Sequence, residues 1–229
     1  MKGRIKYPST FIKMKKVFLL ASLALILIFS QCNKDPNTYV AIDTDFGTMK
    51  VVLYNSTPKH KANFIKLVKK GYYDGLLFHR VMQGFMIQGG DPDSKDAPKG
   101  KFLGLGGPGY TISAEIGAPH IKGTLAAARL GGAENPLKQS SGSQFYIVQG
   151  MVQNAAQLKA VEGRKGITYN SEQRRLYTTI GGTPALDGDY TVFGQVVEGL
   201  EVIDKIAAVR TDRSSRPLKD VKMKIRLLN

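Results

Sequence analysis

Cysteine and histidine, the side chains that most often hold metals in proteins, are scarce in this sequence. A single cysteine, Cys32, cannot form a disulfide within the chain, so an oxidising compartment places no demand on the fold. The three histidines, His60, His79 and His120, do not have the spacing of metal-ligand motifs. We therefore expect no metal and no cofactor, and a structural role for His79.

Long hydrophobic runs are also scarce, and the unbroken one lies near the N-terminus. It comprises thirteen apolar or small residues from Val17 to Phe29, and residues 1–16 before it hold six basic residues and no acidic one. A membrane-spanning helix needs about 20 apolar residues, whereas the apolar segment of a secretory signal peptide has about 7–15. We expect a signal peptide over residues 1–31 and translation from Met14.

The single cysteine directly follows this signal segment, in the position where bacterial lipoproteins carry the cysteine that is lipidated after cleavage. Phe29-Ser30-Gln31 matches the usual small-residue pattern before such a cysteine only loosely, with Gln31 as the departing position. We expect a lipid anchor at Cys32 in the cell envelope, facing the periplasm or the cell surface, with residues 32–38 as a polar tether. Ordinary signal cleavage with a leftover thiol is the alternative.

The excess of positive charge belongs in large part to the signal segment. Without residues 1–31 the chain has 27 basic and 18 acidic residues, a net charge of +9 rather than +15. The remaining basic residues are scattered, and no block alternates them with aromatic residues as nucleic-acid-binding surfaces do. We expect a solvated surface and no nucleic acid partner.

Short segments of alternating apolar and polar residues, separated by turn residues, dominate the chain from residue 39 onward. The expected strands are residues 39–44, 48–54, two within 78–90, 124–129, 144–149 and 221–228. One helix is expected to begin at Pro58, after Thr57 as N-cap, and to end at Gly71, and another to cover residues 199–209. This pattern indicates a mainly β fold, a closed antiparallel barrel rather than a parallel sheet.

Two segments depart from the strand pattern. Residues 91–110 are expected to form a long surface loop, and Gly104 to Gly109 within it formally satisfies the Gly-x-Gly-x-x-Gly dinucleotide fingerprint. No strand leads into that run, no amphipathic helix follows and Pro108 interrupts it, which argues against a nucleotide-binding oxidoreductase. Residues 151–183 have helix-forming composition at 154–162 and 171–180 and predict a partly helical insertion.

The segment from Phe78 to Gly90, Phe-His-Arg-Val-Met-Gln-Gly-Phe-Met-Ile-Gln-Gly-Gly, predicts two short strands around Gly84. Arg80 stands between apolar residues of the first strand. Because a guanidinium keeps its charge and resists burial without a partner, Arg80 needs either a structural acid or a ligand.

This segment closely resembles the signature of the cyclophilins, a family of peptidyl-prolyl cis-trans isomerases, in Phe78-His79-Arg80 and in Gly84 to Asp91. Three later blocks resemble the family in the same order, namely residues 123–129, 141–147 and 186–194. Four blocks in order argue against a chance match. The resemblance covers residues 39–229 outside the insertion and implies a closed eight-stranded antiparallel β-barrel capped by two α-helices. It also places the insertion, which the family's shorter connection lacks, beside the site, where it suggests an added binding role.

The resemblance also implies roles for individual residues. Arg80 matches the family's catalytic arginine. The matched substrate-binding positions are Phe85, Met86, Tyr146 and Leu186 in a proline pocket, Gln88 and Gln144 as orienting glutamines, Ala128 and Arg129 as a backbone-binding strand, and Tyr190 where histidine is frequent. Taken singly, the apolar members are more often core residues, so the joint pattern carries the prediction.

The chemistry implied by this family needs neither a nucleophile nor a metal, because no bond is made or broken. Rotation about an Xaa-Pro bond loses amide resonance, against a barrier of about 18–20 kcal/mol. A dry cavity for the proline ring and a cation directed at the twisted amide would lower that barrier by differential binding. Arg80 suits this role because its planar fork donates at several positions.

Several positions depart from the commonest family pattern. Tyr146 stands where phenylalanine is frequent, Arg129 where asparagine is frequent and Ala185 where many members have tryptophan. The missing indole is expected to weaken binding of cyclosporin-class inhibitors more than isomerisation. The expected partners are proline-containing peptides and unfolded or exported proteins, and the protein is expected to be a monomer. A chaperone module that binds proline segments without turnover is the alternative function.

Overall fold

The computed structural model of the protein describes residues 37–228. The predicted signal peptide, Cys32 and most of the predicted tether lie outside the described residues. Within residues 37–228, no helix is both long enough and apolar enough to cross a membrane.

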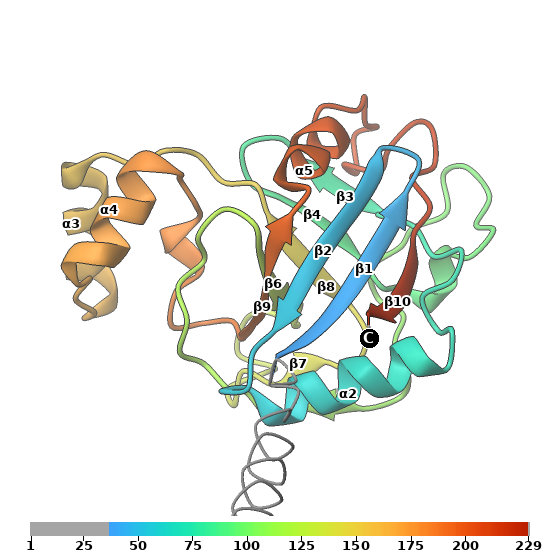
Figure 1. The fold of residues 1–229 in the computed structure, drawn as a ribbon, viewed down its shortest axis with the longest axis horizontal. Helices are drawn as coiled ribbons and strands as arrows, with labels where there is room; N and C mark the ends of the chain where they lie inside the picture. The colour runs from blue at the N-terminus through green and yellow to red at the C-terminus, as the bar shows by residue number, and fades with distance from the viewer. Residues whose placement is uncertain (1–36, 229) are drawn as a thin grey trace, which may run out of the picture. The chain divides into compact units, whose positions relative to one another are not determined.

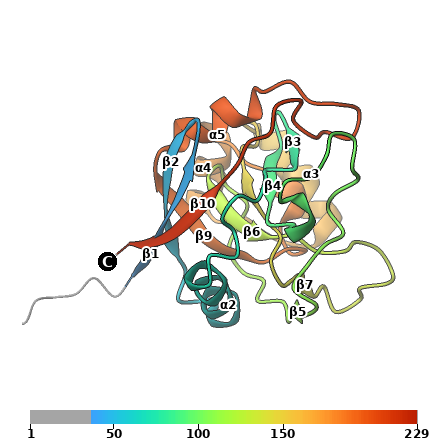
Figure 2. The same ribbon diagram turned by 90° about the vertical axis from the view of Figure 1, so that its right-hand side faces the viewer.

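One antiparallel sheet of eight strands organises the described chain (Figures 1 and 2). Its spatial order is β10-β1-β2-β9-β6-β8-β4-β3. The strands are β1 Thr38–Thr44, β2 Gly47–Leu53, β3 Arg80–Met82, β4 Met86–Gly89, β6 Thr124–Ala127, β8 Phe145–Val148, β9 Val192–Glu198 and β10 Lys224–Leu228. A small separate sheet pairs β5 Thr111–Ile112 with β7 Ser140–Ser141. The predicted mainly β, antiparallel class is confirmed.

The predicted closure of the barrel is wrong, because the sheet is open between β3 and β10. The last expected strand was residues 221–228, but only its second half pairs with β1. Its first half crosses to residues 75–78 instead, where the Gly75 and Phe78 amides each donate at 2.9 Å, to the carbonyls of Met223 and Val221. Because β3 has three residues, it offers too short an edge for a continuous ladder along β10.

Two helices cover opposite ends of the sheet, as predicted (Figure 1). Helix α2, Pro58–Lys69, buries Phe64, Leu67 and Val68, and helix α5, Leu200–Ala207, buries Val202, Ile203, Ile206 and Ala207. Thr57 is the N-cap residue of α2, but its hydroxyl makes no capping hydrogen bond. The Glu115 carboxylate caps the helix instead, accepting from the amides of Lys59 and His60 at 3.1 and 3.0 Å.

The central strands are buried on both faces, which places the candidate site on a covered sheet. On one face the main core packs around Phe64, whose ring lies 5.7 Å from Phe145 and 5.4 Å from Phe193. On the other face a smaller cluster contains Met86, Ala126, Tyr146, Val148 and Val192, with Phe85, Leu186 and Tyr190 packed against it. The residues predicted for substrate binding belong largely to this second cluster.

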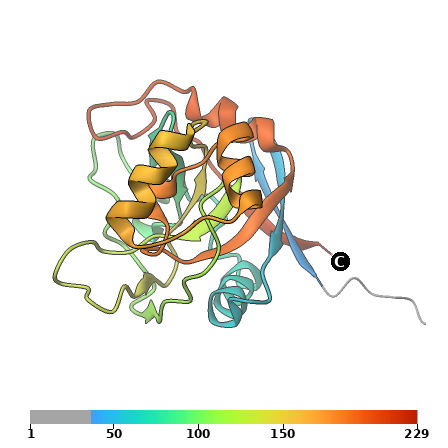
Figure 3. The same ribbon diagram turned by 90° about the vertical axis from the view of Figure 1, so that its left-hand side faces the viewer.

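The predicted insertion contains two helices that lie side by side (Figure 3). They are α3, Ala155–Lys165, and α4, Ser171–Thr179, and each begins with a capping box formed by an asparagine and a glutamine three residues later. Their buried residues, Leu158, Val161 and Tyr177, form a separate small core with Ile121 and Tyr169. The two helical segments predicted here are confirmed, and α3 ends three residues later than expected.

Candidate active site

Arg80 lies on β3 directly opposite Gln88 on β4, so their side chains share one face of the hairpin. The Arg80 Nη1 donates to Gln88 Oε1 at 3.2 Å, and Nη2 lies 3.0 Å from the Met82 sulfur. The guanidinium carbon is 6.0 Å from the centroid of the Phe85 ring. Within residues 37–228, no carboxylate forms an ion pair with it. No structural acid within residues 37–228 therefore accounts for Arg80, and a ligand for it stays a prediction.

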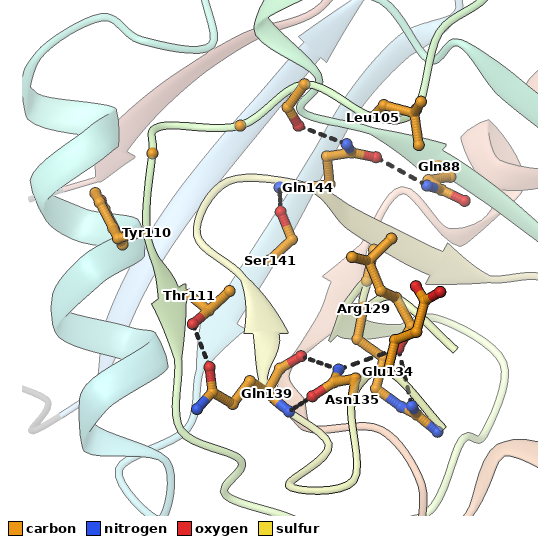
Figure 4. A pocket seen from close by; sticks show the side chains of 16 residues that line it. Gln88, Leu105, Tyr110, Thr111, Arg129, Glu134, Asn135, Gln139, Ser141 and Gln144 are labelled. Carbon is orange, nitrogen blue, oxygen red and sulfur yellow. Dashed lines mark hydrogen bonds between the residues drawn. The ribbon is translucent and has the colours of Figure 1, made fainter. Parts of the chain in front are cut away.

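A chain of amides fixes the orientation of the Arg80 partner. Gln88 Nε2 donates to Gln144 Oε1 at 3.1 Å, and Gln144 Nε2 donates to the Gly106 carbonyl at 2.7 Å (Figure 4). Because both amide nitrogens are used as donors, the Gln88 oxygen is turned toward Arg80. The two predicted orienting glutamines therefore act together, through one hydrogen-bonded row.

Nine of the ten predicted site residues line one small cavity of about 110 Å³. They are Arg80, Phe85, Met86, Gln88, Ala128, Arg129, Tyr146, Leu186 and Tyr190. The tenth, Gln144, lies behind Gln88 and lines the adjoining groove.

Polar contacts hold the aromatic side of the small cavity. The Tyr146 hydroxyl lies 2.9 Å from His120 Nε2, and burial raises the pKa of Tyr146 well above its ordinary value. Arg129 stacks over Tyr190, with the guanidinium carbon 4.6 Å from the ring centroid, and its Nε donates to the Asp189 carbonyl at 2.8 Å. The Arg129 side chain thus forms part of the wall.

Comparison with known proteins shows which family shares this arrangement. The family model described as cyclophilin type peptidyl-prolyl cis-trans isomerase/CLD matches residues 39–226. The chain belongs to the cyclophilins. It is therefore a peptidyl-prolyl cis-trans isomerase.

Two curated relatives from bacteria are similar to this chain. A Staphylococcus haemolyticus protein with the provisional name of peptidyl-prolyl cis-trans isomerase is 36% identical over 203 residues, covering 84% of this chain and 93% of the relative. A Streptococcus pyogenes protein, provisionally named a bifunctional phosphatase/peptidyl-prolyl cis-trans isomerase, is 36% identical over 218 residues. That match covers 90% of this chain but 43% of the relative, so this chain spans less than half of the bifunctional protein.

Solved cyclophilins share the fold. A Cryptosporidium parvum cyclophilin type peptidyl-prolyl cis-trans isomerase is similar with a TM-score of 0.59 and 27% identity, covering 84% of this chain and 98% of that protein. The same protein crystallised in the presence of the dipeptide Ala-Pro gives a TM-score of 0.58 and 26% identity, covering 83% and 99%.

A wider groove of about 700 Å³ adjoins the small cavity in this cyclophilin (Figure 4). The two spaces share Gln88, Ala128 and Arg129. Residues of the glycine-rich run from Gly104 to Gly109 form one wall of the groove, and Leu130 and Asn135 belong to another. The run therefore shapes a surface beside the isomerase site, and no strand leads into it and no helix follows it.

The backbone of Ala128 is not available to a bound peptide. Its amide donates to the Gln144 carbonyl at 3.0 Å, and its carbonyl accepts from the Ser141 amide at 2.7 Å. Within the described part of the chain, the backbone of Arg129 makes no such bond. Of the two residues predicted to form a backbone-binding strand, Ala128 thus lines the cavity with its methyl group, while the Arg129 peptide unit is open.

His120 and Asp187 are site-supporting residues that the sequence analysis missed. His120 was considered only as a metal ligand, and Asp187 only as part of a family block. The available signal was Tyr146 itself, since a buried tyrosine hydroxyl in place of phenylalanine needs a hydrogen-bond partner. His79, by contrast, is buried and does not line the small cavity, in agreement with the structural role expected for it.

Proposed function

We propose that this cyclophilin assists the folding of exported proteins by isomerising Xaa-Pro bonds in the small cavity, with Arg80 as the catalytic residue. The observation that carries the proposal is the position of the Arg80 guanidinium, which has no ion-pair partner within residues 37–228, among the residues that line the small cavity. Phe85, Met86 and Leu186 supply apolar surface for the proline ring.

Arg80 would act by binding the twisted amide more tightly than the planar one. When conjugation is lost, the prolyl nitrogen regains its lone pair and becomes a better hydrogen-bond acceptor. A guanidinium held at the cavity stabilises that state without reorganising, because the Gln88–Gln144 row fixes its partner oxygen. Such stabilisation, absent in the ground state, lowers the barrier of about 18–20 kcal/mol.

The substrate would lie across both spaces. The presence of the dipeptide Ala-Pro with the Cryptosporidium parvum cyclophilin supports a proline-containing peptide as the ligand. With proline in the small cavity, the neighbouring residues of the peptide would reach the groove past Ala128 and Arg129, which line both spaces. The open peptide unit of Arg129 is a suitable hydrogen-bond partner for an extended chain.

The test is exchange NMR on an Xaa-Pro model peptide with the protein and its Arg80→Ala variant. Removal of a transition-state donor is expected to lower the isomerisation rate about 10²–10³-fold, with little change in peptide affinity. Arg226→Ala is the matched control, because Arg226 is an exposed arginine paired with Asp43 at the distant β1–β10 edge. Full catalysis by the Arg80 variant would sink the proposal, and binding without catalysis by both proteins would favour the chaperone function.

The lipid anchor at Cys32 is likewise a proposal, and it rests on the sequence. The first strand begins at Thr38, six residues after Cys32, so a short tether separates the cysteine from the fold. In a bacterial host, the wild-type chain is expected to incorporate labelled palmitate and to fractionate with membranes, while Cys32→Ser loses both properties. Equal labelling of the two chains would exclude the anchor.

The isomerase domain without its anchor is expected to sediment as a monomer.

A further inference from the structure

A buried carboxylate joins the insertion to the wall of the small cavity. Asp187 directly follows Leu186, is 5% exposed, and receives four hydrogen bonds. Its Oδ1 accepts from the His120 amide at 2.8 Å and bonds His120 Nδ1 at 2.7 Å. Its Oδ2 accepts from the hydroxyls of Tyr169 and Tyr177 at 2.7 and 2.5 Å. Tyr177 lies on α4 and Tyr169 just before it, so both hydroxyls come from the insertion.

The directions of these bonds follow from the donors available. A carboxylate only accepts, so His120 Nδ1 carries the proton that faces Asp187, and Nε2 is turned toward Tyr146. The Tyr146 hydroxyl lies 2.9 Å from Nε2. Burial raises the pKa values of Tyr146, Tyr169 and Tyr177, which keeps all three hydroxyls protonated. A continuous path thus runs from α4 through Asp187 and His120 to a residue that lines the small cavity.

A second contact from the insertion reaches the same loop. The Lys165 Nζ at the end of α3 donates to the Asp187 carbonyl at 2.9 Å and pairs with the Asp189 carboxylate. Lys138 also pairs with Asp189, at 2.7 Å, and the two lysines lower the pKa of Asp189 to about 2. The insertion therefore contacts both sides of the short segment between Leu186 and Tyr190, which are two wall residues of the small cavity.

We propose that the α3–α4 insertion is a positioning element for the small cavity, in which Tyr169 and Tyr177 hold Asp187, and Asp187 through His120 holds Tyr146. Leu186 and Tyr190 are set by the same attachment. The inference rests on the proposed assignment of the small cavity as the proline site. It gives the insertion a part in substrate binding through contacts within the chain.

The kinetic signature of positioning differs from that of a loss of folding. The walls contact the proline ring in the planar and the twisted state alike, so displacing them removes uniform binding, which raises KM and leaves kcat unchanged. A purely structural role would lower the active fraction, which reduces the apparent kcat and leaves KM unchanged.

The test uses Tyr169→Phe/Tyr177→Phe in the full chain, with exchange NMR and peptide titration as readouts. The double variant keeps both rings and removes only the two hydroxyls that reach Asp187. We expect KM to rise about five- to ten-fold with kcat within two-fold of the wild type. The control is Val161→Ala, a truncation inside the insertion core that leaves every bond to Asp187 in place. It should lower stability without changing KM.

A double-mutant cycle tests the path itself. If Tyr177 acts on the cavity through Tyr146, the effects of Tyr177→Phe and Tyr146→Phe on peptide affinity are less than additive. Additive effects, or an unchanged KM in the Tyr169/Tyr177 variant, would overturn the proposal.

Hydrogen exchange separates this claim from the proposed function. The Leu186 and Asp189 amides donate within the loop, and they should exchange faster in the Tyr169/Tyr177 variant than in Val161→Ala. If the wild type bound peptide without isomerising it, the proposed function would fail, while the exchange rates and peptide affinities would still decide the positioning role. Equal exchange in the two variants would contradict that role.

Discussion

At the β3–β4 edge the guanidinium of Arg80 has an amide oxygen and thioether sulfurs around it, whereas across the small cavity the carboxylate of Asp187 receives four hydrogen bonds. The Arg80 guanidinium keeps N–H donors that can bind a ligand, whereas all four acceptor positions of the Asp187 carboxylate are used. In the proposed mechanism, the charge that acts on the transition state is the one that the protein leaves without an ion pair, while the carboxylate that holds the cavity wall has all its hydrogen bonds made within the protein.

The largest effect on stability is expected at Asp187, whose carboxylate receives four hydrogen bonds beside the cavity wall. Asp187→Asn removes the charged acceptor of two tyrosine hydroxyls and the His120 ring, and places amide donors among them. Breaking such a buried network is expected to lower the free energy of unfolding by about 3–5 kcal/mol. Urea denaturation measures this. Asp43→Asn, which breaks the exposed pair with Arg226, should cost less than about 1 kcal/mol. If both variants lost the same free energy of unfolding, the buried network would stabilise the fold no more than an exposed ion pair does.

A smaller effect on stability is expected from His79, the buried residue that precedes Arg80 in the chain. Burial lowers the pKa of His79 from 6.5 to about 4. Between these values the unfolded chain binds a proton that the folded chain does not, so stability is full above pH 6.5 and falls as the pH drops toward 4. The loss is roughly 2–3 kcal/mol. Denaturation midpoints from pH 7 to 4.5 should fall more steeply for the wild type than for His79→Asn, and parallel slopes would contradict the assignment.

The residue pattern was sufficient to predict the two short strands that carry Arg80, and the resemblance to the cyclophilins named the residues that line the small cavity. Arg80, Phe85, Met86 and Gln88 lie within nine consecutive residues, and the pairing of two short strands around Gly84 puts Arg80 opposite Gln88. The helix starts were also predictable, because the capping asparagines of α3 and α4 are local signals. The end of α3 was set three residues too early, at Glu162, whereas the helix runs to Lys165 and Gly166, with φ of 65°, is the C-cap.

The hydrogen bonds of Asp187 and the open sheet were not predictable, because both depend on contacts distant in sequence. Whether residues 221–223 continue along β1 or cross to residues 75–78 is a choice of register that no local pattern specifies. Likewise, nothing near Tyr177 indicates that its hydroxyl meets Asp187, ten residues later, with His120 on the other side. The added binding role that the sequence suggested for the insertion stays a prediction, and the support of the cavity that we propose for it rests on contacts that only the structure shows.

The most direct measurement compares Arg80→Ala and Tyr169→Phe/Tyr177→Phe in one experiment, with peptide affinity by titration and isomerisation at saturation by exchange NMR. The two variants are expected to change different parameters. The Arg80 variant binds the peptide nearly as well as the wild type but isomerises it about 10²–10³-fold more slowly. The tyrosine variant binds about five- to ten-fold more weakly but isomerises at nearly the wild-type rate once saturated. If both variants change the same parameter, the division of the site into a reactive edge and a supporting wall is wrong.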